Sequence, residues 1–310
     1  MIVAISHDGD DHAAPVLEAL RGLGTRAVLF DVATFPARSA LALDYGGRRR
    51  RWTLEGPGFS IAVEDVTGVW WRRPRLLQAE PGLPAEHEDF ALRQADEALS
   101  GLAASLPARW VNHPWRDAAA SHKPFQLAAA ERAGLRLPRT LVTNDPARAR
   151  SFLAAARGKR VVHKALHATP EDWHTTRMVG PEDRRRLPAL RLAPVILQEY
   201  VPGVDVRVTA VGGALFAAAI DARETASPHD FRPVYDDARV EPLELPAVLA
   251  GRLRALLAEL GLSYAAIDLR RREDGEYVFL EVNPSGQWLF VERRTGLPIT
   301  GAVAALLAGR

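Results

Sequence analysis

The chain has 310 residues, which is enough for one large hydrophobic core or for two to three smaller ones. Hydrophobic residues make up 47% of it and charged residues 25%, the balance of a soluble globular protein, and the formal net charge of +2 argues against a chain that binds polyanions over its whole surface. The absence of cysteine excludes disulfides and thiolate metal sites, and it is compatible with the reducing cytoplasm.

Targeting and membrane segments are not expected. Residues 1–6 are a short apolar run without a basic lead or a cleavage site, unlike a signal peptide. No apolar run approaches the roughly 20 residues of a membrane helix, and no basic stripe is interleaved with aromatic residues as in nucleic-acid-binding proteins. We therefore expect a cytoplasmic protein that has neither a membrane nor a nucleic acid as its partner.

The N-terminal part of the chain predicts a βαβ unit. Short apolar strands over 2–6 and 26–30 flank a helix over 14–23, and this order predicts a parallel sheet with covered faces. The loop 6–12 lies at the carboxyl end of the first strand, where open α/β sheets bind ligands. It lacks a Gly-x-Gly-x-x-Gly motif, so we reject a dinucleotide site there.

A domain boundary follows a long helix. A β-hairpin over 40–63 and a strand over 68–71 precede an amphipathic helix over 86–106, which is closed by Pro107. We therefore expect three domains, of residues 1–108, 109–195 and 196–310. The elements expected in the second and third domains are helices over 121–133, 146–156, 246–260 and 301–307, strands over 139–142 and 160–164, a polar irregular stretch over 167–191, and antiparallel hairpins over 204–221 and 267–283.

The last of these hairpins carries a candidate metal site. Glu281 and Asn283 are two residues apart on a strand, so their side chains leave the same face. The hairpin turn over 273–276 brings Asp268 beside them. Two carboxylates and one amide oxygen suit Mg²⁺, which completes its shell with water and substrate phosphates. The alternative is a hairpin with a polar outer face; the metal site is favoured by the apolar alternation of the opposite face, through Val278, Leu280 and Val282.

This Asp…Glu-x-Asn arrangement resembles the metal site of the ATP-grasp ligase superfamily. More specifically, the chain is similar to the graspetide (microviridin-type) ribosomal peptide maturases in the segments Asp31 with 34–36, 69–74, 286–288, and Glu292 with 295–299. The resemblance implies a fold of class α/β (α+β), with an N-terminal βαβ pre-ATP-grasp domain followed by two α+β subdomains that sandwich ATP. Within 69–74, core packing of Trp70 and Trp71 is an equally good interpretation.

The resemblance also implies which residues bind the nucleotide, with ATP and Mg²⁺ as cofactors. Lys123 and Lys164 match the two lysines that contact the phosphates, and two cations on separate elements can bracket a polyphosphate. Residues of the hinge between the two subdomains would present backbone groups to the adenine edge, with Glu199 assigned to the adenine amino group. These hinge residues are Gln198, Glu199, Tyr200 and Val201.

Two residues after the hinge have roles with stated alternatives. Asp205 is assigned to the ribose hydroxyls or to a supporting position behind the site. Arg207 is assigned, with Lys164, to catalysis, because a planar guanidinium can bind the γ-phosphate and the acyl-phosphate with two parallel hydrogen bonds. The alternative for Arg207 is a salt bridge to Asp205.

One departure from the superfamily lies after Lys164. Many members carry a glycine-rich loop over the phosphates, whereas 165–178 contains no glycine, so cradling of phosphates by backbone N–H groups is not expected. We expect a mobile lid in this stretch, in which His167, Thr175, Thr176 and Arg177 are the alternative contacts to phosphate or substrate.

The implied reaction is ATP-dependent carboxylate activation. In graspetide maturases an Asp or Glu side chain of a ribosomal precursor peptide becomes an acyl-phosphate, and a Ser, Thr or Lys side chain of the same peptide attacks it to close an ester or amide ring. The alternative is a glutamate-ligase-like or small-molecule carboxylate–amine ligase that joins two separate substrates. The expected partner is an acidic precursor peptide with a Thr/Ser- or Lys-containing core, drawn to the basic runs 48–51 and 184–186 unless these are solvated turns. A homodimer is a further expectation.

Overall fold

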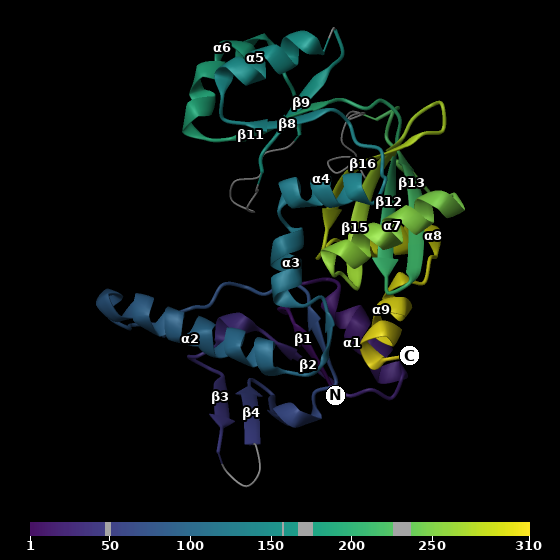
Figure 1. Ribbon diagram of the computed structural model, residues 1–310. Helices are drawn as coiled ribbons and strands as arrows, with labels where there is room; N and C mark the ends of the chain where they lie inside the picture. Colours follow the sequence, from purple (N-terminus) through teal and green to yellow (C-terminus); the bar gives the residue numbers. More distant parts are fainter. Residues whose placement is uncertain (47–50, 157, 167–175, 226–236) are drawn as a thin grey trace. The chain divides into compact units, whose positions relative to one another are not determined.

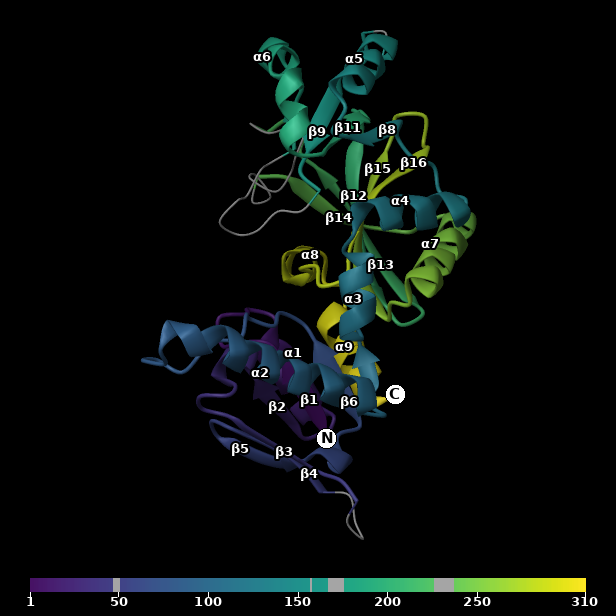
Figure 2. The ribbon, with the colours of Figure 1, turned by 60° about the vertical axis from the view of Figure 1, so that its left-hand side comes forward.

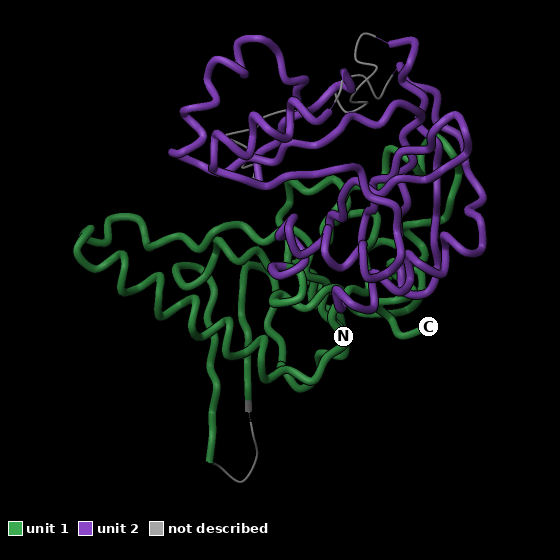
Figure 3. Tube along the Cα trace, turned by 45° about the horizontal axis from the view of Figure 1, so that its top comes forward, with its two compact units in different colours: residues 1–117, 262–264, 284–310 green, residues 118–261, 265–283 purple. Residues whose placement is uncertain are grey.

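The computed structural model describes residues 1–46, 51–156, 158–166, 176–225 and 237–310 (Figure 1). The chain forms two compact units, coloured separately in Figure 3: residues 1–117, 262–264 and 284–310 make the first, and residues 118–261 and 265–283 make the second. The C-terminal segment therefore folds with the N-terminal part of the chain. The finer division at 108 and 195 stays a prediction.

The first unit is built on a parallel sheet. β1 (Ile2–Ile5) pairs in parallel with β2 (Ala27–Phe30) on one side and with β6 (Gly68–Trp71) on the other, and β7 (Arg109–Val111) extends the sheet beyond β6. α1 (Ala13–Gly22) connects β1 to β2, so the predicted βαβ unit is confirmed.

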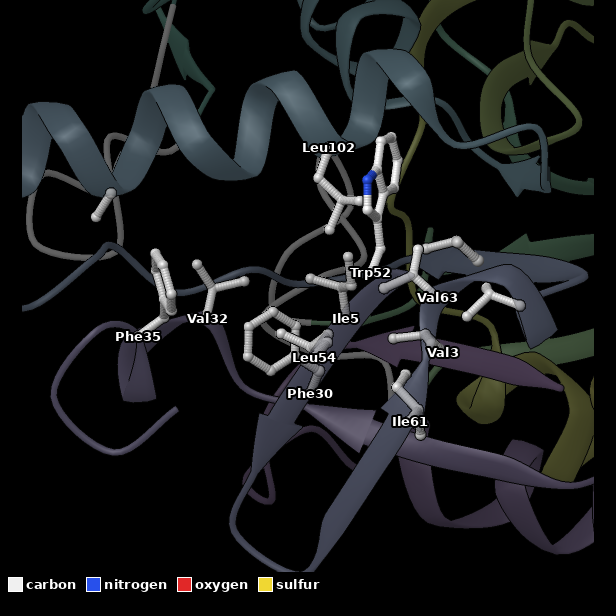
Figure 4. Close-up of a cluster of buried hydrophobic side chains, with 13 residues drawn as sticks. Val3, Ile5, Phe30, Val32, Phe35, Trp52, Leu54, Ile61, Val63 and Leu102 are labelled. Carbon is white, nitrogen blue, oxygen red and sulfur yellow. The ribbon is translucent and has the colours of Figure 1, made fainter. Parts of the chain in front are cut away.

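A second, antiparallel sheet packs on the first where a single hairpin was expected. It consists of β3 (Ala40–Asp44), β4 (Arg51–Gly56) and β5 (Phe59–Ala62). Its apolar side chains meet those of β1 and β2, and Ala95 and Leu102 of the long helix α2 (Ala85–Ser105) join them (Figure 4). The side chains at the centre of this core are Val3, Ile5, Phe30, Trp52, Leu54, Ile61 and Leu102.

Three further helices complete the first unit. α3 (Pro114–Ala120) follows β7 and runs into the second unit, and α8 (Leu289–Thr295) and α9 (Ile299–Ala308) lie near the C-terminus. α9 packs against α1 and β6. The contact with β6 is close: a Cβ at Gly68 would lie 2.9 Å from the carbonyl oxygen of Leu307, which explains the glycine.

The second unit contains a four-stranded antiparallel sheet of order β10-β9-β11-β8. Its strands are β8 (Thr140–Thr143), β9 (Val161–Lys164), β10 (Arg177–Met178) and β11 (Val195–Glu199). α5 (Pro146–Ala155) covers one face (Figure 2), and the Asp145 carboxylate caps this helix by accepting from the N–H groups of Ala147 and Arg148.

The expectation of an irregular stretch over 167–191 was wrong in its second half. β10, α6 (Pro181–Arg185) and a 3₁₀ segment (Leu187–Leu192) lie there. The helix begins at a proline, whose fixed φ suits the first helical position, and Asp183 accepts from the N–H of Gly180 (2.8 Å). Residues 167–175, on which the expected lid depended, lie outside the described part of the chain.

A five-stranded sheet of order β14-β13-β12-β15-β16 forms the rest of the second unit. The strands are β12 (Val204–Val211), β13 (Ala214–Asp221), β14 (Arg239–Leu243), β15 (Tyr264–Arg271) and β16 (Tyr277–Asn283). α4 (Lys123–Arg132) packs against β16 and against α7 (Ala247–Leu260), as Figure 1 shows. In the parts that the structure describes, no helix is long and apolar enough to cross a membrane.

Candidate active site

The hairpin of β15 and β16 places the three predicted metal ligands on one face. Asp268 lies directly opposite Glu281, and Ala266 lies opposite Asn283. Side chains of cross-strand partners leave the same face of a sheet, and Asn283 follows Glu281 by two residues. The placement agrees with the sequence analysis, while the metal-binding role itself stays a prediction.

A β-bulge interrupts the apolar alternation expected for β16. The register shifts between Asp268, which faces Glu281, and Leu269, which faces Phe279. Leu280 is thereby the extra residue of β16, and both Val278 and Phe279 are buried. Bulges redirect side chains and strengthen the local twist, so the bulge here sets the direction of the strand end that carries Glu281.

The carboxylates of this face are ion-paired with cations of neighbouring elements. The Arg207 Nε lies 3.1 Å from the Asp268 Oδ1, across β12 and β15. The Lys123 ammonium at the start of α4 bonds to the Glu281 carboxylate. A Mg²⁺ ion would thus have to replace two cations at its carboxylate ligands.

The sequence analysis offered a salt bridge between Arg207 and Asp205 as the alternative for that arginine. The structure pairs Arg207 with Asp268, and Asp205 with Arg270 at 2.8 Å. Residues two apart on one strand project in parallel, so each side chain reaches a partner on the adjacent strand more readily than its neighbour along the same strand. Arg270 was not anticipated, although its position two residues after Asp268 on β15 places it on the same face.

The donor set fits Mg²⁺ better than a metal that needs an all-protein cage. Among the described residues no group of three His, Cys, Asp or Glu side chains could hold a metal ion. Asp268 and Glu281 are only two carboxylates, and Asn283 adds a neutral oxygen. Mg²⁺ is commonly bound by one or two carboxylates together with water and phosphate oxygens, so these residues fit that ion.

A hollow beside the hairpin brings the predicted phosphate ligands together. Residues of α4, β9, β11 and β16 line it. The lining residues are Lys123, Gln126, Leu127, Lys164, Ile196, Gln198, Leu280 and Glu281. Both predicted lysines and one predicted metal ligand therefore face a single space, although they lie far apart in the sequence.

The predicted adenine hinge is tightly bonded within its own unit. The buried Gln198 donates from Nε2 to the Thr140 Oγ1 (2.9 Å). The Glu199 carboxylate is 2.9 Å from the Lys159 Nζ and 3.8 Å from the nearest Arg139 guanidinium nitrogen. These cations would compete with an adenine amino group for the Glu199 carboxylate. The adenine would have to displace them or share the carboxylate with them, and the adenine role of Glu199 stays a prediction.

Tyr200 and the residues after it form the end of this hinge. The Arg160 guanidinium lies over the Tyr200 ring, 4.4 Å from its centroid, and the Arg270 guanidinium lies 5.7 Å from it. Arg270 also donates to the carbonyl oxygen of Gly203 (3.2 Å). The half-buried Val201 lies between these anchored residues, so the hinge enters β12 along a fixed path.

In the first unit, the ligand crevice expected at the carboxyl ends of β1 and β6 is filled by the chain itself. The buried Arg72, which follows β6, donates to the carbonyl oxygens of Ser285 (2.5 Å) and Gly286 (2.8 Å). The His12 Nε2 accepts from the N–H groups of Trp288 (3.1 Å) and Leu289 (3.3 Å). Residues 285–289 thus occupy the place where open α/β sheets usually bind ligands.

The surroundings of His12 and Asp10 favour the neutral imidazole and the ionised carboxylate. Burial lowers the pKa of His12, which leaves the Nε2 free of a proton and able to accept. Burial alone would raise the pKa of Asp10, but hydrogen bonds from His12 and the charge of Arg72 hold it well below its usual range. Trp288, which the sequence analysis associated with the peptide maturases, is fully buried beside Trp70, so both tryptophans are core residues.

Asp117 is the one carboxyl of this region with a raised pKa. Burial raises it to about 6, against the opposing effects of the Ser285 hydroxyl, which donates to it at 3.0 Å, and of the Arg72 charge. Because its pKa is higher in the folded than in the unfolded state, protonated Asp117 favours folding, and this contribution is lost as the group ionises. No motif in the sequence marks Asp117.

The fold and this arrangement of charges define an ATP-grasp protein. Residues 1–118 match the family model of the MvdD pre-ATP grasp domain. The macrocyclase MdnC of Microcystis aeruginosa MRC, solved with its precursor peptide MdnA, is 27% identical with a TM-score of 0.88, over 100% of this chain and 99% of that chain. A search of curated proteins gave no match.

Two further solved structures cover nearly the whole chain. The macrocyclase MdnB of Microcystis aeruginosa MRC is 31% identical with a TM-score of 0.82, over 99% of this chain and 98% of that chain. The ATP-grasp ligase PsnB, complexed with minimal precursor, Mg and ADP, is 28% identical with a TM-score of 0.78, over 99% and 96%. The chain belongs to the graspetide-maturase family of ATP-grasp ligases.

Proposed function

We propose that the protein is an ATP-dependent ligase that cross-links a ribosomally made precursor peptide through its own side chains. The observation that carries this proposal is the convergence of Lys123, Lys164 and Glu281 on one hollow, with Arg207 and Asp268 on the same sheet as Glu281. Family membership supports it, because MdnC and PsnB were solved with precursor peptides.

The proposed reaction has two steps. A carboxylate of the peptide attacks the γ-phosphorus of ATP, so that ADP leaves and an acyl-phosphate forms. A Ser or Thr hydroxyl, or a Lys amine, of the same peptide then attacks the acyl carbon; phosphate leaves, the nucleophile loses its proton, and an ester or amide remains. The peptide loses one water per cross-link, and ATP becomes ADP and phosphate.

The ion pairs of the site show how the protein balances its own charges. Lys123 is paired with Glu281, and Arg207 with Asp268. Lys123 and Arg207 would turn to the phosphates of a bound nucleotide, and Glu281 and Asp268 would then be available as metal ligands, so each charge would exchange its partner. Charged groups already held in place cost little reorganisation when the transferring phosphoryl group develops its charge.

The proposed roles follow from position. Lys123 and Lys164 hold the phosphates, and Arg207 binds the γ-phosphate and then the acyl-phosphate. Mg²⁺, when bound by Asp268, Glu281 and Asn283, supplies positive charge against the transferring phosphoryl oxygens.

The adenine and ribose are assigned to the hinge. Its residues 198–201 would present backbone groups to the adenine edge, and Asp205, which Arg270 already holds, would support the ribose side from behind.

The peptide substrate is proposed to be acidic, with Thr/Ser or Lys nucleophiles in its core. The exposed arginines 184–186 at the end of α6 support this preference, although Arg186 also pairs with Glu182. Residues 48–50 of the other basic run, 48–51, lie outside the described residues. A homodimer in the cytoplasm is the proposed form of the enzyme.

The experiment is intact-mass analysis of a small acidic, Thr/Ser-rich peptide encoded beside the gene, after incubation with the protein and Mg-ATP. Loss of one or more waters, dependent on ATP and absent with Glu281→Ala, supports intramolecular cross-linking. A gain equal to an amino acid or another acceptor would instead favour the ligase that joins two separate substrates. ATP hydrolysis without any change in peptide mass would refute the choice of substrate.

A further inference from the structure

The strand that carries two of the predicted metal ligands is an edge strand. Among the strands that the structure describes, β16 pairs with β15 alone, so the N–H and C=O groups along its other side need partners elsewhere. The N–H of Phe279 donates to the carbonyl oxygen of Arg136 (2.8 Å). The segment that matters most for chemistry follows it, from Glu281 to Pro284.

A buried carboxamide completes the open edge at Val282. The Gln126 Oε1 accepts from the N–H of Val282 (3.0 Å), and its Nε2 donates to the carbonyl oxygen of the same residue (2.8 Å) and to that of Ala120 (2.7 Å). Gln126 is only 3% exposed. Its amide therefore takes the place of a neighbouring strand for the one residue that separates Glu281 from Asn283.

The helix that carries Gln126 also holds the side chain of Glu281. Lys123 lies three residues earlier on α4, and its ammonium bonds to the Glu281 carboxylate. Residues three apart lie on the same face of a helix. One face of α4 thus fixes both a backbone residue of β16 and the carboxylate beside it.

A second buried carboxamide, in the first unit, binds the backbone of Pro284, the residue that follows Asn283 in the sequence. The Asn112 Nδ2 donates to the carbonyl oxygens of Tyr264 (2.9 Å) and Pro284 (3.0 Å), and its Oδ1 accepts from the N–H groups of Ser263 (2.8 Å) and Tyr264 (3.0 Å). This side chain uses both donors and both acceptor sites of its amide. Asn112 is 1% exposed.

Pro284 explains why such a residue is needed. A proline has no N–H group and cannot continue the ladder between β15 and β16, so the ladder ends at the pair of Ala266 and Asn283. The carbonyl oxygens beyond this pair still need donors. Asn112 supplies a donor to each strand of the hairpin. One goes to Pro284, directly after the end of β16, and the other to Tyr264, the first residue of β15.

We propose that Gln126 and Asn112 are positioning residues, which set the metal affinity of the Glu281–Asn283 segment by fixing the backbone on either side of Asn283. This inference rests on the proposed function, because it assumes that the segment binds the divalent cation. Neither side chain is among the predicted ligands of metal or nucleotide. Partners that hold metal ligands in place typically change metal affinity or activity by about 10–100-fold when they are removed.

The test is the affinity of the full-length protein for Mn²⁺ in the presence of ADP, measured from the free Mn²⁺ signal in electron paramagnetic resonance. Gln126→Met keeps the approximate shape of the side chain and removes its three hydrogen bonds. We expect the dissociation constant for Mn²⁺ to rise about 10–100-fold, by a larger factor than that for ADP without metal. Asn112→Ser, whose hydroxyl is too short to reach both strands, should weaken Mn²⁺ binding in the same sense.

Asp145→Ala is the matched control in the second unit. It removes the cap of α5 and lowers the melting temperature. Asp145 hydrogen-bonds to residues 143, 147 and 148, none of which belongs to β16, so Mn²⁺ affinity should not change. Folded Gln126→Met protein with wild-type Mn²⁺ affinity would refute the positioning role. Loss of folding in both Gln126→Met and Asn112→Ser would also overturn it in favour of a purely structural role. Wild-type protein that binds no Mn²⁺ with ADP would refute the proposed metal site itself.

Discussion

The pair of Arg207 and Asp268 allows the proposed exchange of partners to be tested by stability. Their closest atoms are 3.1 Å apart, and the side chains are 9% and 18% exposed, respectively. Opposite charges about 4 Å apart at an effective dielectric constant of 20 attract by about 4 kcal/mol. Removal of one partner of a buried pair typically costs about 3–5 kcal/mol, because the other charge is left buried without compensation. We expect Arg207→Met to lower the free energy of unfolding of the second unit by about 3 kcal/mol, at the lower end of that range.

The double variant Arg207→Met/Asp268→Asn isolates the interaction. Because it leaves no charge uncompensated, we expect it to be more stable than the sum of the single changes predicts, with a coupling energy of about 2 kcal/mol. Mg²⁺ with ADP should stabilise Arg207→Met by more than it stabilises the wild type, since the cation then neutralises Asp268. The turnover of Arg207→Met should nevertheless fall by about 10²–10³-fold, the usual cost of losing one donor to a developing charge.

The assay is urea unfolding followed by far-ultraviolet circular dichroism, with and without Mg²⁺ and ADP. Tryptophan fluorescence serves as an internal control, because every tryptophan except Trp173 belongs to the first unit, where Arg207 is not located. A coupling energy near zero would refute the argument that these two charges compensate each other. Equal stabilisation of variant and wild type by Mg²⁺ and ADP would refute the exchange of partners.

Three further changes test the site and its surroundings. Glu281→Ala should reduce ATP turnover by at least about 100-fold. It should change the free energy of unfolding by less than about 1 kcal/mol, because the pair of Glu281 with Lys123 is partly exposed. A variant that keeps most of its turnover would refute the assignment of Glu281 as a metal ligand. Lys164→Ala should weaken ATP binding about tenfold or more, through loss of a charged hydrogen-bond donor, and an unchanged affinity in a direct binding measurement would refute that role. Asp117→Asn should stabilise the first unit at pH 8 by at most about 3 kcal/mol, since the pKa of Asp117 is about 6 in the folded state against 3.8 for the free group. The raised pKa of Asp117 favours folding fully below pH 3.8 and no longer does so above pH 6. Urea unfolding followed by tryptophan fluorescence should therefore show no gain in the free energy of unfolding at pH 3.5. An equal gain at pH 3.5 and pH 8 would contradict the assignment.

The sequence predicted the face on which a site residue lies, but not its partner on the next strand. Period-two spacing placed Glu281 and Asn283 together, and the hairpin turn placed Asp268 opposite them. Strand order is a property of the whole sheet, so the pairing of Arg207 with Asp268 could not be read from spacing. The bulge at Leu280 was missed for a related reason, because an extra residue in one strand is visible only against its neighbour.

Long-range contacts account for the remaining differences. The sequence analysis continued the last domain to residue 310, yet 284–310 lie in the same compact unit as the N-terminal sheet. His12 and Arg72 bind the backbone of this segment, and backbone groups have no signature in a sequence. Gln126 and Asn112 were missed because a single buried amide cannot be distinguished from a solvated one until its partners are known.

The position of the candidate metal ligands at a sheet edge carries both an advantage and a cost. An edge strand is free of a neighbouring strand on one side, so α4 can bring Lys123 to Glu281 there and share the hollow with β9 and β11. The cost is a row of backbone groups, beside the residues whose geometry matters most, that need partners from outside the sheet. A further strand would satisfy them but would fill the space that the nucleotide is proposed to use. The side-chain amide of Gln126 satisfies one residue of that edge without extending the sheet, which leaves the edge both ordered and accessible.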